Sequence, residues 1–280
     1  MRIVRKVIDS NYLRDPALAD YLGRSPRHIA VLTEFVLLEA HKKDPLITVP
    51  KSIAILAQFP DQVEVIRPSR RLARFPGRSA GLQRRLIDQE QSRAFAELCR
   101  QMRRTRDDPA TQEAIRRTAE IASTHIDGLV AAAPTIIALF QGHVARFTPA
   151  ELVALRTRQS RSPDMQRKLL DIVVETTKDV AATTSAIPPA CRPAEIANLP
   201  VFRYCLCMML LFIRWIEVGR QTKTANNRIA NDVIDANIAA YATYFDGVLS
   251  TDGKLRALHR EARQVLREIG GAVPAQHRLS

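Results

Sequence analysis

Cysteine, glycine and aromatic residues are scarce in this sequence. Its 280 residues include four cysteines, ten glycines and only 5% aromatic side chains, so the core must be built mainly from Leu, Ile, Val and Ala. The cysteines lack the paired spacing of a zinc site, and we interpret them as small buried hydrophobes. They are Cys99, Cys191, Cys205 and Cys207. No G-x-G-x-x-G motif, phosphate-binding loop or G-x-S-x-G motif is present, which excludes the usual nucleotide-binding and serine hydrolase signatures.

Long hydrophobic runs are also lacking. The nearest approach to one is Tyr204–Ile213, ten residues that lie between Arg203 and Arg214. A membrane span needs roughly 18 apolar residues. The first residues are basic, and the apolar stretch of a secretory signal does not follow them. We therefore expect a cytoplasmic protein that makes no membrane contact.

The charge is strongly unbalanced towards the positive. The formal net charge is +13, and arginine supplies 34 of the 42 basic residues. Residues 67–106 contain twelve arginines and three acidic residues, which gives this segment a net charge of +9. Such a stripe suits the phosphate backbone of a nucleic acid, whose contacts are electrostatic, but it equally suits a solvated helix face. The sequence leaves both interpretations open.

The two ends of the chain predict strands as well as helices. Short apolar strands are expected at 3–8, 63–66 and 247–250. Residues 29–41 fit either a strand followed by a helix or one buried helix. Pro50 is expected to open a helix over 52–58. Further helices are predicted over 201–219, 225–245 and 254–269.

The middle of the chain, residues 77–198, has no strand pattern. Helices are predicted over 82–106, 109–140 and 151–183, because helix formers recur there with apolar residues three and four positions apart. Thr148 is expected to cap the last of these helices, with Glu151 as its partner. Strands near both termini with a helical block between them indicate one α/β domain interrupted by an insertion.

Several acidic residues stand where folding alone would not place them. Asp9 and Asp252 each follow a short strand, and the carboxyl ends of strands are where open α/β sheets bind ligands. Asp235 and Glu39 are embedded in apolar helical stretches, and Asp232 shares a helix face with Asp235. A carboxylate among buried hydrophobes is costly unless it is paired, hydrogen-bonded or bound to a metal ion. Each acid taken singly also fits a helix cap or an arginine partner.

Acidic groups that converge from separate elements repel one another unless a cation lies between them. Oxygen ligands without cysteine or histidine favour Mg²⁺ or Mn²⁺ over zinc. The six histidines are scattered and none is paired at metal-ligand spacing on a helix. The joint pattern of acids therefore predicts a divalent-cation site.

Four of these acidic motifs resemble those of PIN-domain nucleases. The stretch 7–13 (Val-Ile-Asp-Ser-Asn-Tyr-Leu) is similar to the opening strand of the family, with Asp9 as its aspartate. The stretch 30–39 resembles the second motif, with Glu39 rather than Glu34 as the matching glutamate. Residues 235–240 resemble the third motif, and 248–252 the fourth, where Ser250 replaces a threonine and keeps its hydroxyl.

The resemblance implies a fold as well as a site. It covers residues 1–76 and 199–280, which would form the two halves of a PIN-like domain, with 77–198 as an all-helical insertion. The implied fold class is α/β, a three-layer PIN-like (Rossmann-like) parallel sheet with helices on both faces. The 122-residue insertion before the third motif departs from the family pattern, and it leaves substrate, partners and regulation open.

The resemblance also implies an activity, that of a metal-dependent endoribonuclease. Asp9, Glu39 and Asp235 would hold one or two Mg²⁺ or Mn²⁺ ions, and Asp252 would complete the cluster. Asp232 would support the ligands, and Ser10, Asn11 or Ser250 would position water. Because acidic clusters repel RNA, the arginine stripe is the candidate surface that attracts it. Its candidate RNA-binding residues are Arg67, Arg70, Arg71, Arg74, Arg78, Arg84 and Arg85.

Other functions fit the same sequence. The chain is alternatively a catalytically silent PIN-like or helical module that binds RNA or a protein partner, or a DNA nuclease. A third possibility is an all-helical scaffold, in which the expected strands are buried helix segments. A toxin, defence or RNA-processing role, a homo-oligomer and an inhibitor protein as partner are all compatible with a nuclease of this kind.

Overall fold

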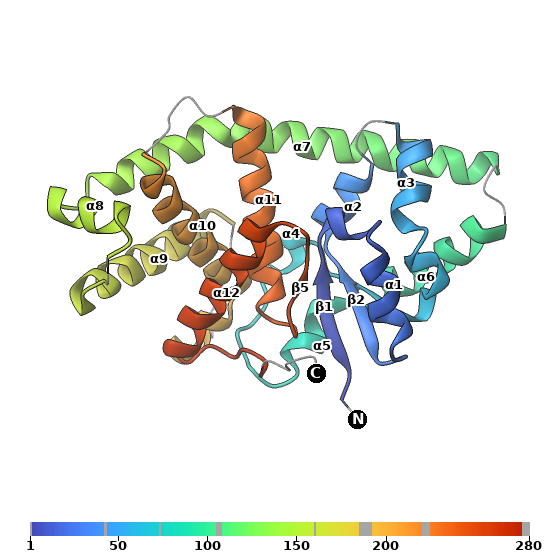
Figure 1. Cartoon of the computed structure of the whole chain (residues 1–280), viewed down its shortest axis with the longest axis horizontal. Helices are drawn as coiled ribbons and strands as arrows, with labels where there is room; N and C mark the ends of the chain where they lie inside the picture. Colours follow the sequence, from blue (N-terminus) through green and yellow to red (C-terminus); the bar gives the residue numbers. More distant parts are fainter. Residues whose placement is uncertain are drawn as a thin grey trace.

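The chain is a mixed α/β protein with one sheet and many helices (Figure 1). The computed structural model describes residues 2–41, 44–72, 74–104, 108–159, 161–184, 192–219 and 225–275. Cys191 and Arg106, one of the twelve arginines counted above, lie outside the described residues.

The five-stranded sheet has the order β4-β3-β2-β1-β5. Its strands are β1 (Val4–Ile8), β2 (His28–Leu32), β3 (Val63–Ile66), β4 (Ile87–Asp88) and β5 (Val248–Leu249). The pairs β1–β2, β2–β3 and β1–β5 are parallel, and Val7 lies opposite both Val31 and Val248. The expected strands are confirmed, and residues 29–41 form a strand followed by a helix. Runs of buried apolar side chains are typical of parallel strands covered by helices.

Strand β4 was not expected from the sequence. It pairs antiparallel with β3, with Ile87 opposite Ile66, at one edge of the sheet. The prediction of a wholly parallel sheet was therefore wrong at this edge. So was the prediction that residues 77–198 contain only helices. A strand of two residues is too short to produce the alternation by which strands are found in a sequence.

Helices make up most of the remaining structure. The α-helices are α1 (Pro16–Gly23), α2 (Glu34–Ala40), α3 (Pro45–Ile53), α4 (Ser69–Leu72), α5 (Leu82–Leu86), α6 (Gln89–Arg104), α7 (Pro109–Val144), α8 (Pro149–Arg156), α9 (Pro163–Thr184), α10 (Pro200–Glu217), α11 (Asn226–Ala242) and α12 (Gly253–Glu268). The 3-10 helices are η1 (Ser10–Tyr12), η2 (Leu56–Gln58), η3 (Pro60–Gln62) and η4 (Pro193–Asn198).

Most helix boundaries follow from capping residues. Thr148 caps α8, and its side chain and that of Glu151 form the expected reciprocal pair. The helix expected to begin at Pro50 instead begins at Pro45 and contains Pro50. Asp44 accepts a hydrogen bond from the backbone N–H of Leu46, so Asp44–Pro45 provides both a cap and a first-turn proline.

The helices of the middle segment pack onto the sheet domain. In Figure 1, α7 runs along the top of the view, and it contacts α2, α3 and α11. Helix α6 packs against β3, and α8 and α9 pack against α10. Side chains from these helices and from the sheet belong to one continuous apolar cluster. The division at residues 76 and 198 stays a prediction.

A buried arginine joins three segments of this core. Arg203 on α10 has no exposed surface. It donates hydrogen bonds to the Ala197 and Ala272 carbonyls at 3.0 and 2.8 Å, and to Thr243 Oγ1 at 3.0 Å. Its guanidinium carbon lies 3.7 Å from the ring centre of Tyr244. These acceptors are neutral, and burial lowers the pKa of Arg203 below its ordinary value.

Helix α7 is long and apolar enough to cross a membrane by length and composition alone. Only 11% of its most apolar 18-residue stretch is buried, and Ile121 and Leu139 are among its exposed side chains. Its residues 128–145 contain no Asp, Glu, Lys or Arg, but Pro134, Thr135, Gln141 and His143 interrupt the apolar run, so the sequence shows no unbroken apolar stretch there. A single helix of this kind does not establish a membrane span. The absence of membrane contact therefore stays a prediction, as does the cytoplasmic location.

Candidate active site

The first acid of the site, Asp9, lies directly after β1 and caps η1. Its side chain is 5% exposed. Asp9 Oδ1 accepts a hydrogen bond from the Ser10 backbone N–H at 2.7 Å, and Oδ2 accepts one from Ser250 Oγ at 2.5 Å. The local sequence explains this position, because an aspartate after a strand satisfies the free backbone N–H groups of the next helical turn.

The fourth motif brings Asp252 to the same edge of the sheet. Asp252 follows β5 and caps α12, and it accepts a hydrogen bond from the Lys254 backbone N–H at 2.6 Å. Since β1 and β5 are parallel, with Ile8 opposite Leu249, the residues that follow them emerge side by side. In the sheet, β1 lies between β2, the next strand of the chain, and β5, the last one. The strand order therefore reverses at β1, and open α/β sheets bind ligands at the carboxyl end of such a point.

Glu39 approaches this edge from α2. Its Oε2 accepts a hydrogen bond from Ser10 Oγ at 2.5 Å. Glu34, on the same helix, instead accepts a hydrogen bond from the Ser69 backbone N–H at 3.0 Å. A hollow of about 300 Å³ opens beside Glu39 and is also lined by Arg14. Of the two glutamates, Glu39 is therefore the one that lies next to Asp9.

The third motif adds Asp235 and Asp232 from α11. Asp232 forms an ion pair with the amine of Lys254. Asp235 lies one turn further along the helix and is partly buried. Burial raises the pKa of Asp235, and the charge of Lys254 opposes this rise, so the lysine lies close to both aspartates. Helix α11 thus presents both acids towards the start of α12.

The pKa shifts show that these carboxylates are close enough to repel one another. Burial raises the pKa of Asp9; the hydrogen bond from Ser250 opposes this rise, and the charges of Glu39 and Asp252 add to it. Burial also raises the pKa of Asp235, to about 7, and the charges of Asp252 and Asp9 contribute. The four predicted acids therefore interact, although they come from four separate parts of the chain.

The donor chemistry of the site fits a hard divalent cation. Buried carboxylates with raised pKa values are held at an energetic cost that a bound cation removes. As the side chains are placed, no group of three carboxylate, imidazole or thiol side chains within the described ranges lies close enough to ligate one ion. Asp9 and Glu39 are turned towards Ser250 and Ser10. Binding an ion would require them to exchange these hydroxyl partners for the metal.

The predicted RNA-binding arginines do not form one uniform surface. Arg67 donates to the Arg85 carbonyl at 3.1 Å, and the Arg85 guanidinium lies over the ring of Phe75. Arg71 lies 3.9 Å from the Asp88 carboxylate. The remaining four of the seven are exposed: Arg70, Arg74, Arg78 and Arg84. Part of the stripe therefore makes local contacts, and its exposed part remains a candidate surface for RNA.

No protein-family model, curated protein or solved structure matches this chain. The resemblance to PIN-domain nucleases therefore rests on the four motifs alone.

Sequence reasoning missed two basic residues beside the acids. Lys254 interacts with Asp232 and Asp235, and its only sequence signal is its place two residues after Asp252. Arg14 donates to Ser52 Oγ at 2.9 Å in the hollow beside Glu39, and no motif marks it. Ser10 and Ser250, expected to position water, bind carboxylates directly.

Asp246, another acid near the fourth motif, lies away from the cluster. Its carboxylate accepts hydrogen bonds from the Arg5 backbone N–H at 2.8 Å and from the side chain of Arg2 at 2.7 Å. Arg5 belongs to the amino-terminal part of β1 and Arg2 lies just before it, whereas Asp9 follows its carboxyl end. Asp246 therefore supports the start of β1.

Proposed function

We propose that this chain is a PIN-like, metal-dependent nuclease that hydrolyses phosphodiester bonds in RNA. The observation that supports it most is that Asp9, Glu39, Asp235 and Asp252 lie near one another at the edge of the sheet where β1 and β5 end. Asp9 and Asp252 also cap helices, but four buried or partly buried acids from separate elements repel one another at this distance unless a cation offsets their charge.

The proposed fold is the three-layer PIN-like arrangement with residues 77–198 as its helical insertion. Two features support it. The motifs occur in the family's order, and the first and fourth follow neighbouring parallel strands. In Figure 1, β1, β2 and β5 lie between α11 and α12 on one side and α1 and α3 on the other.

Each acidic residue has a proposed role. Asp9, Glu39 and Asp235 hold one or two Mg²⁺ or Mn²⁺ ions, with Asp252 completing the set. A bound divalent cation supplies positive charge that activates water and offsets the charge on the phosphate. Asp232 keeps the amine of Lys254 beside Asp235, where this lysine attracts and orients a substrate phosphate.

The charge of the chain supports a nucleic acid as the substrate. A net charge of +13 attracts polyanions over a long range and compensates for the repulsion between RNA and the acids. The exposed arginines of the stripe, such as Arg70 and Arg74, are proposed to make non-specific phosphate contacts. A toxin, defence or RNA-processing role, and control by an inhibitor protein or by homo-oligomer formation, stay open within this proposal.

The decisive experiment measures Mn²⁺-dependent cleavage of labelled single-stranded RNA. Asp9→Asn and Glu39→Gln should abolish cleavage while the protein stays folded. Glu34→Gln is the matched control, because it changes a glutamate of the same helix that bonds Ser69 instead. Equal cleavage by all variants would reveal a contaminating nuclease and contradict the proposal. Cleavage of the matching single-stranded DNA but not of RNA would replace RNA with DNA as the substrate.

A second candidate is a catalytically silent module that binds RNA or a protein partner. One observation favours it: no three possible metal ligands within the described part of the chain converge on one point. Calorimetric titration with Mn²⁺ separates the two candidates. Binding to the wild type that Asp9→Asn abolishes supports the nuclease. RNA binding without any Mn²⁺ binding supports the silent module.

A further inference from the structure

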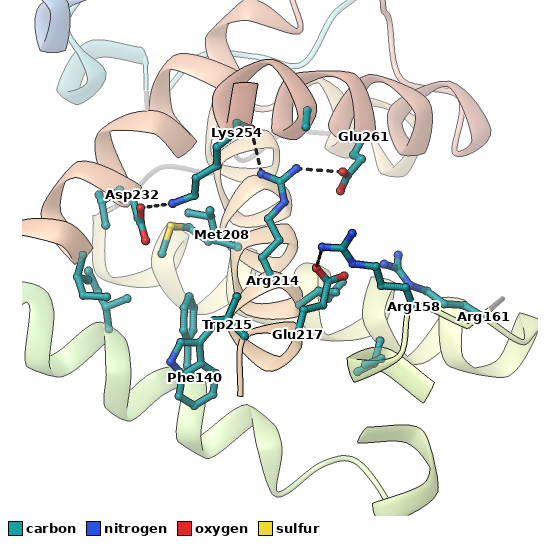
Figure 2. Close-up of a pocket in the computed structure, with 18 of the residues that line it drawn as sticks. Phe140, Arg158, Arg161, Met208, Arg214, Trp215, Glu217, Asp232, Lys254 and Glu261 are labelled. Carbon is teal, nitrogen blue, oxygen red and sulfur yellow. Dashed lines mark hydrogen bonds and ion pairs between the residues drawn. The ribbon is translucent and has the colours of Figure 1, made fainter. Parts of the chain in front are cut away.

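A second cavity lies beside the acidic cluster and has no role in the proposed chemistry. It has a volume of about 850 Å³ and lies between α7 to α9 on one side and α10 to α12 on the other (Figure 2). Asp232 and Lys254 form part of its wall, and Figure 2 shows them paired at one end. Asp235 is three residues further along α11, about 4.5 Å of helix rise. The cavity therefore adjoins the acidic cluster.

The wall of this cavity is positively charged. Six basic side chains and three acidic ones line it, which gives a net charge of +3. Each acid already has a basic partner in the wall: Glu217 lies 3.0 Å from Arg158, Glu261 lies 2.9 Å from Arg214, and Asp232 pairs with Lys254.

Three cations of the wall remain without a carboxylate partner among the residues that the structure describes. They are Arg161, Arg228 and Arg260. Arg228 and Arg260 are exposed, and Arg161 is half-buried. They come from three different elements: the segment between α8 and α9, the start of α11, and α12. A ligand with several negative charges would form ion pairs with all three arginines.

Apart from Gln159 and Gln166, the rest of the wall is apolar and aromatic. Phe140 and Trp215 lie with their ring centres 5.7 Å apart and are 5% and 8% exposed, and Met208 belongs to the same wall (Figure 2). Val218, also in the wall, is 57% exposed. A small inorganic anion needs no such surface, whereas a nucleotide presents a flat base together with charged phosphate. A cavity of this volume is the size of a small-ligand pocket, which suits one or two unpaired nucleotides rather than a duplex.

We infer that this cavity binds the nucleotides next to the scissile phosphate of a single-stranded RNA. The inference rests on the proposed function and extends it by assigning a substrate subsite. Base and sugar contact the apolar wall, and Arg161, Arg228 and Arg260 bind phosphates. Lys254, shared by cavity and acidic cluster, guides the strand from one to the other. The helical segment thus contributes α7 and the loop after α8 to substrate binding.

The test uses the only tryptophan of the chain, Trp215, as a reporter inside the cavity. A six-nucleotide oligoadenylate RNA is titrated into the full-length protein in EDTA, so that no cleavage occurs. Saturable quenching of tryptophan fluorescence is expected. The triple variant Arg161→Ala/Arg228→Ala/Arg260→Ala should bind about 100-fold more weakly at 0.1 M salt, and its salt slope should fall by about 2, since each lost phosphate contact removes about 0.7 from that slope.

A matched control removes three exposed arginines outside the cavity. Arg24→Ala/Arg156→Ala/Arg267→Ala causes the same loss of charge, these arginines lie outside the arginine stripe, and none of them has a carboxylate partner among the described residues. The control should retain the affinity and salt slope of the wild type. Equal weakening of both triple variants, or RNA binding that leaves tryptophan fluorescence unchanged, would overturn the inference.

The outcomes separate this inference from the proposed activity. RNA that binds in the cavity but is never cut with Mn²⁺ would support the subsite and contradict the nuclease. RNA that is cut, and that the cavity variant binds as tightly as the wild type, would support the nuclease and contradict the subsite. A short polyglutamate peptide that competes with RNA at equal concentration, with the same dependence on the three arginines, would overturn RNA as the occupant and indicate an acidic protein segment.

Discussion

Replacing Asp235 by asparagine should stabilise the protein at neutral pH when no divalent ion is present. Burial, together with the charges of Asp252 and Asp9, raises the pKa of the folded-state carboxyl to about 7, against 3.8 for the unfolded chain. Below about pH 3 both states hold the proton, so this group costs nothing. As the pH rises from about 4 to about 7, the unfolded chain loses the proton that the folded protein keeps, and the free energy of unfolding falls.

The size of this loss follows from the two pKa values. About three decades of difference correspond to about 4 kcal/mol once the pH exceeds both, at 1.36 kcal/mol for each decade. Asp235→Asn has no proton to lose. Its free energy of unfolding should therefore match that of the wild type near pH 3, and exceed it by about 1 kcal/mol at pH 4.5 and by about 4 kcal/mol at pH 7.5.

The assay is urea unfolding in EDTA at pH 4.5, 6 and 7.5, followed by tryptophan fluorescence. Asp171→Asn, which removes an exposed carboxylate from α9, is the control. Adding Mn²⁺ at 100 times its dissociation constant should raise the stability of the wild type by about 2.7 kcal/mol, and that of Asp235→Asn by much less. A variant that is no more stable than the wild type at pH 7.5 would refute the argument that Asp235 is a strained, buried carboxylate.

Three further predictions concern stability. Arg203→Lys should lower the free energy of unfolding by about 3 kcal/mol in a urea titration, because lysine cannot reproduce the planar set of donors and leaves buried acceptors without partners. Burial lowers the pKa of His259 to about 4, so this group should cost the folded protein about 3 kcal/mol between pH 6.5 and pH 4, as only the unfolded chain takes up the proton; in the Asp235→Asn background, which removes the opposing titration of Asp235, His259→Leu should abolish most of this pH dependence. Gly77→Ala should lower the melting temperature, because its Cβ would lie 2.1 Å from the Glu195 carbonyl oxygen, whereas Gly142→Ala on the open face of α7 should raise it.

The acidic site was predictable because each of its members has a local signal. Asp9 and Asp252 directly follow apolar strand patterns, and Asp235 and Glu39 interrupt apolar helices. Short-range patterns of this kind fix which side chains emerge at a strand end or on a helix face. The parallel arrangement of the sheet then follows from the placement of helices between strands.

The contacts around the site were not predictable in the same way. The pairing of Lys254 with Asp232 and the hydrogen bond from Ser10 to Glu39 join residues 22 and 29 positions apart. They depend on how α11, α12 and η1 are oriented, and periodicity does not contain that information. The same holds for β4 and for the second cavity, whose wall comes from six helices and a loop.

The burial of helix α10 limits how the chain can be shortened or redesigned. Nearly all of its residues are buried, because α8 and α9 cover one side while α11 and α12 cover another. A shortened chain in which residues 77–198 are replaced by a brief linker would expose this helix to water, and α11 would lose its contact with α7. The middle segment therefore cannot be removed or transplanted without α10.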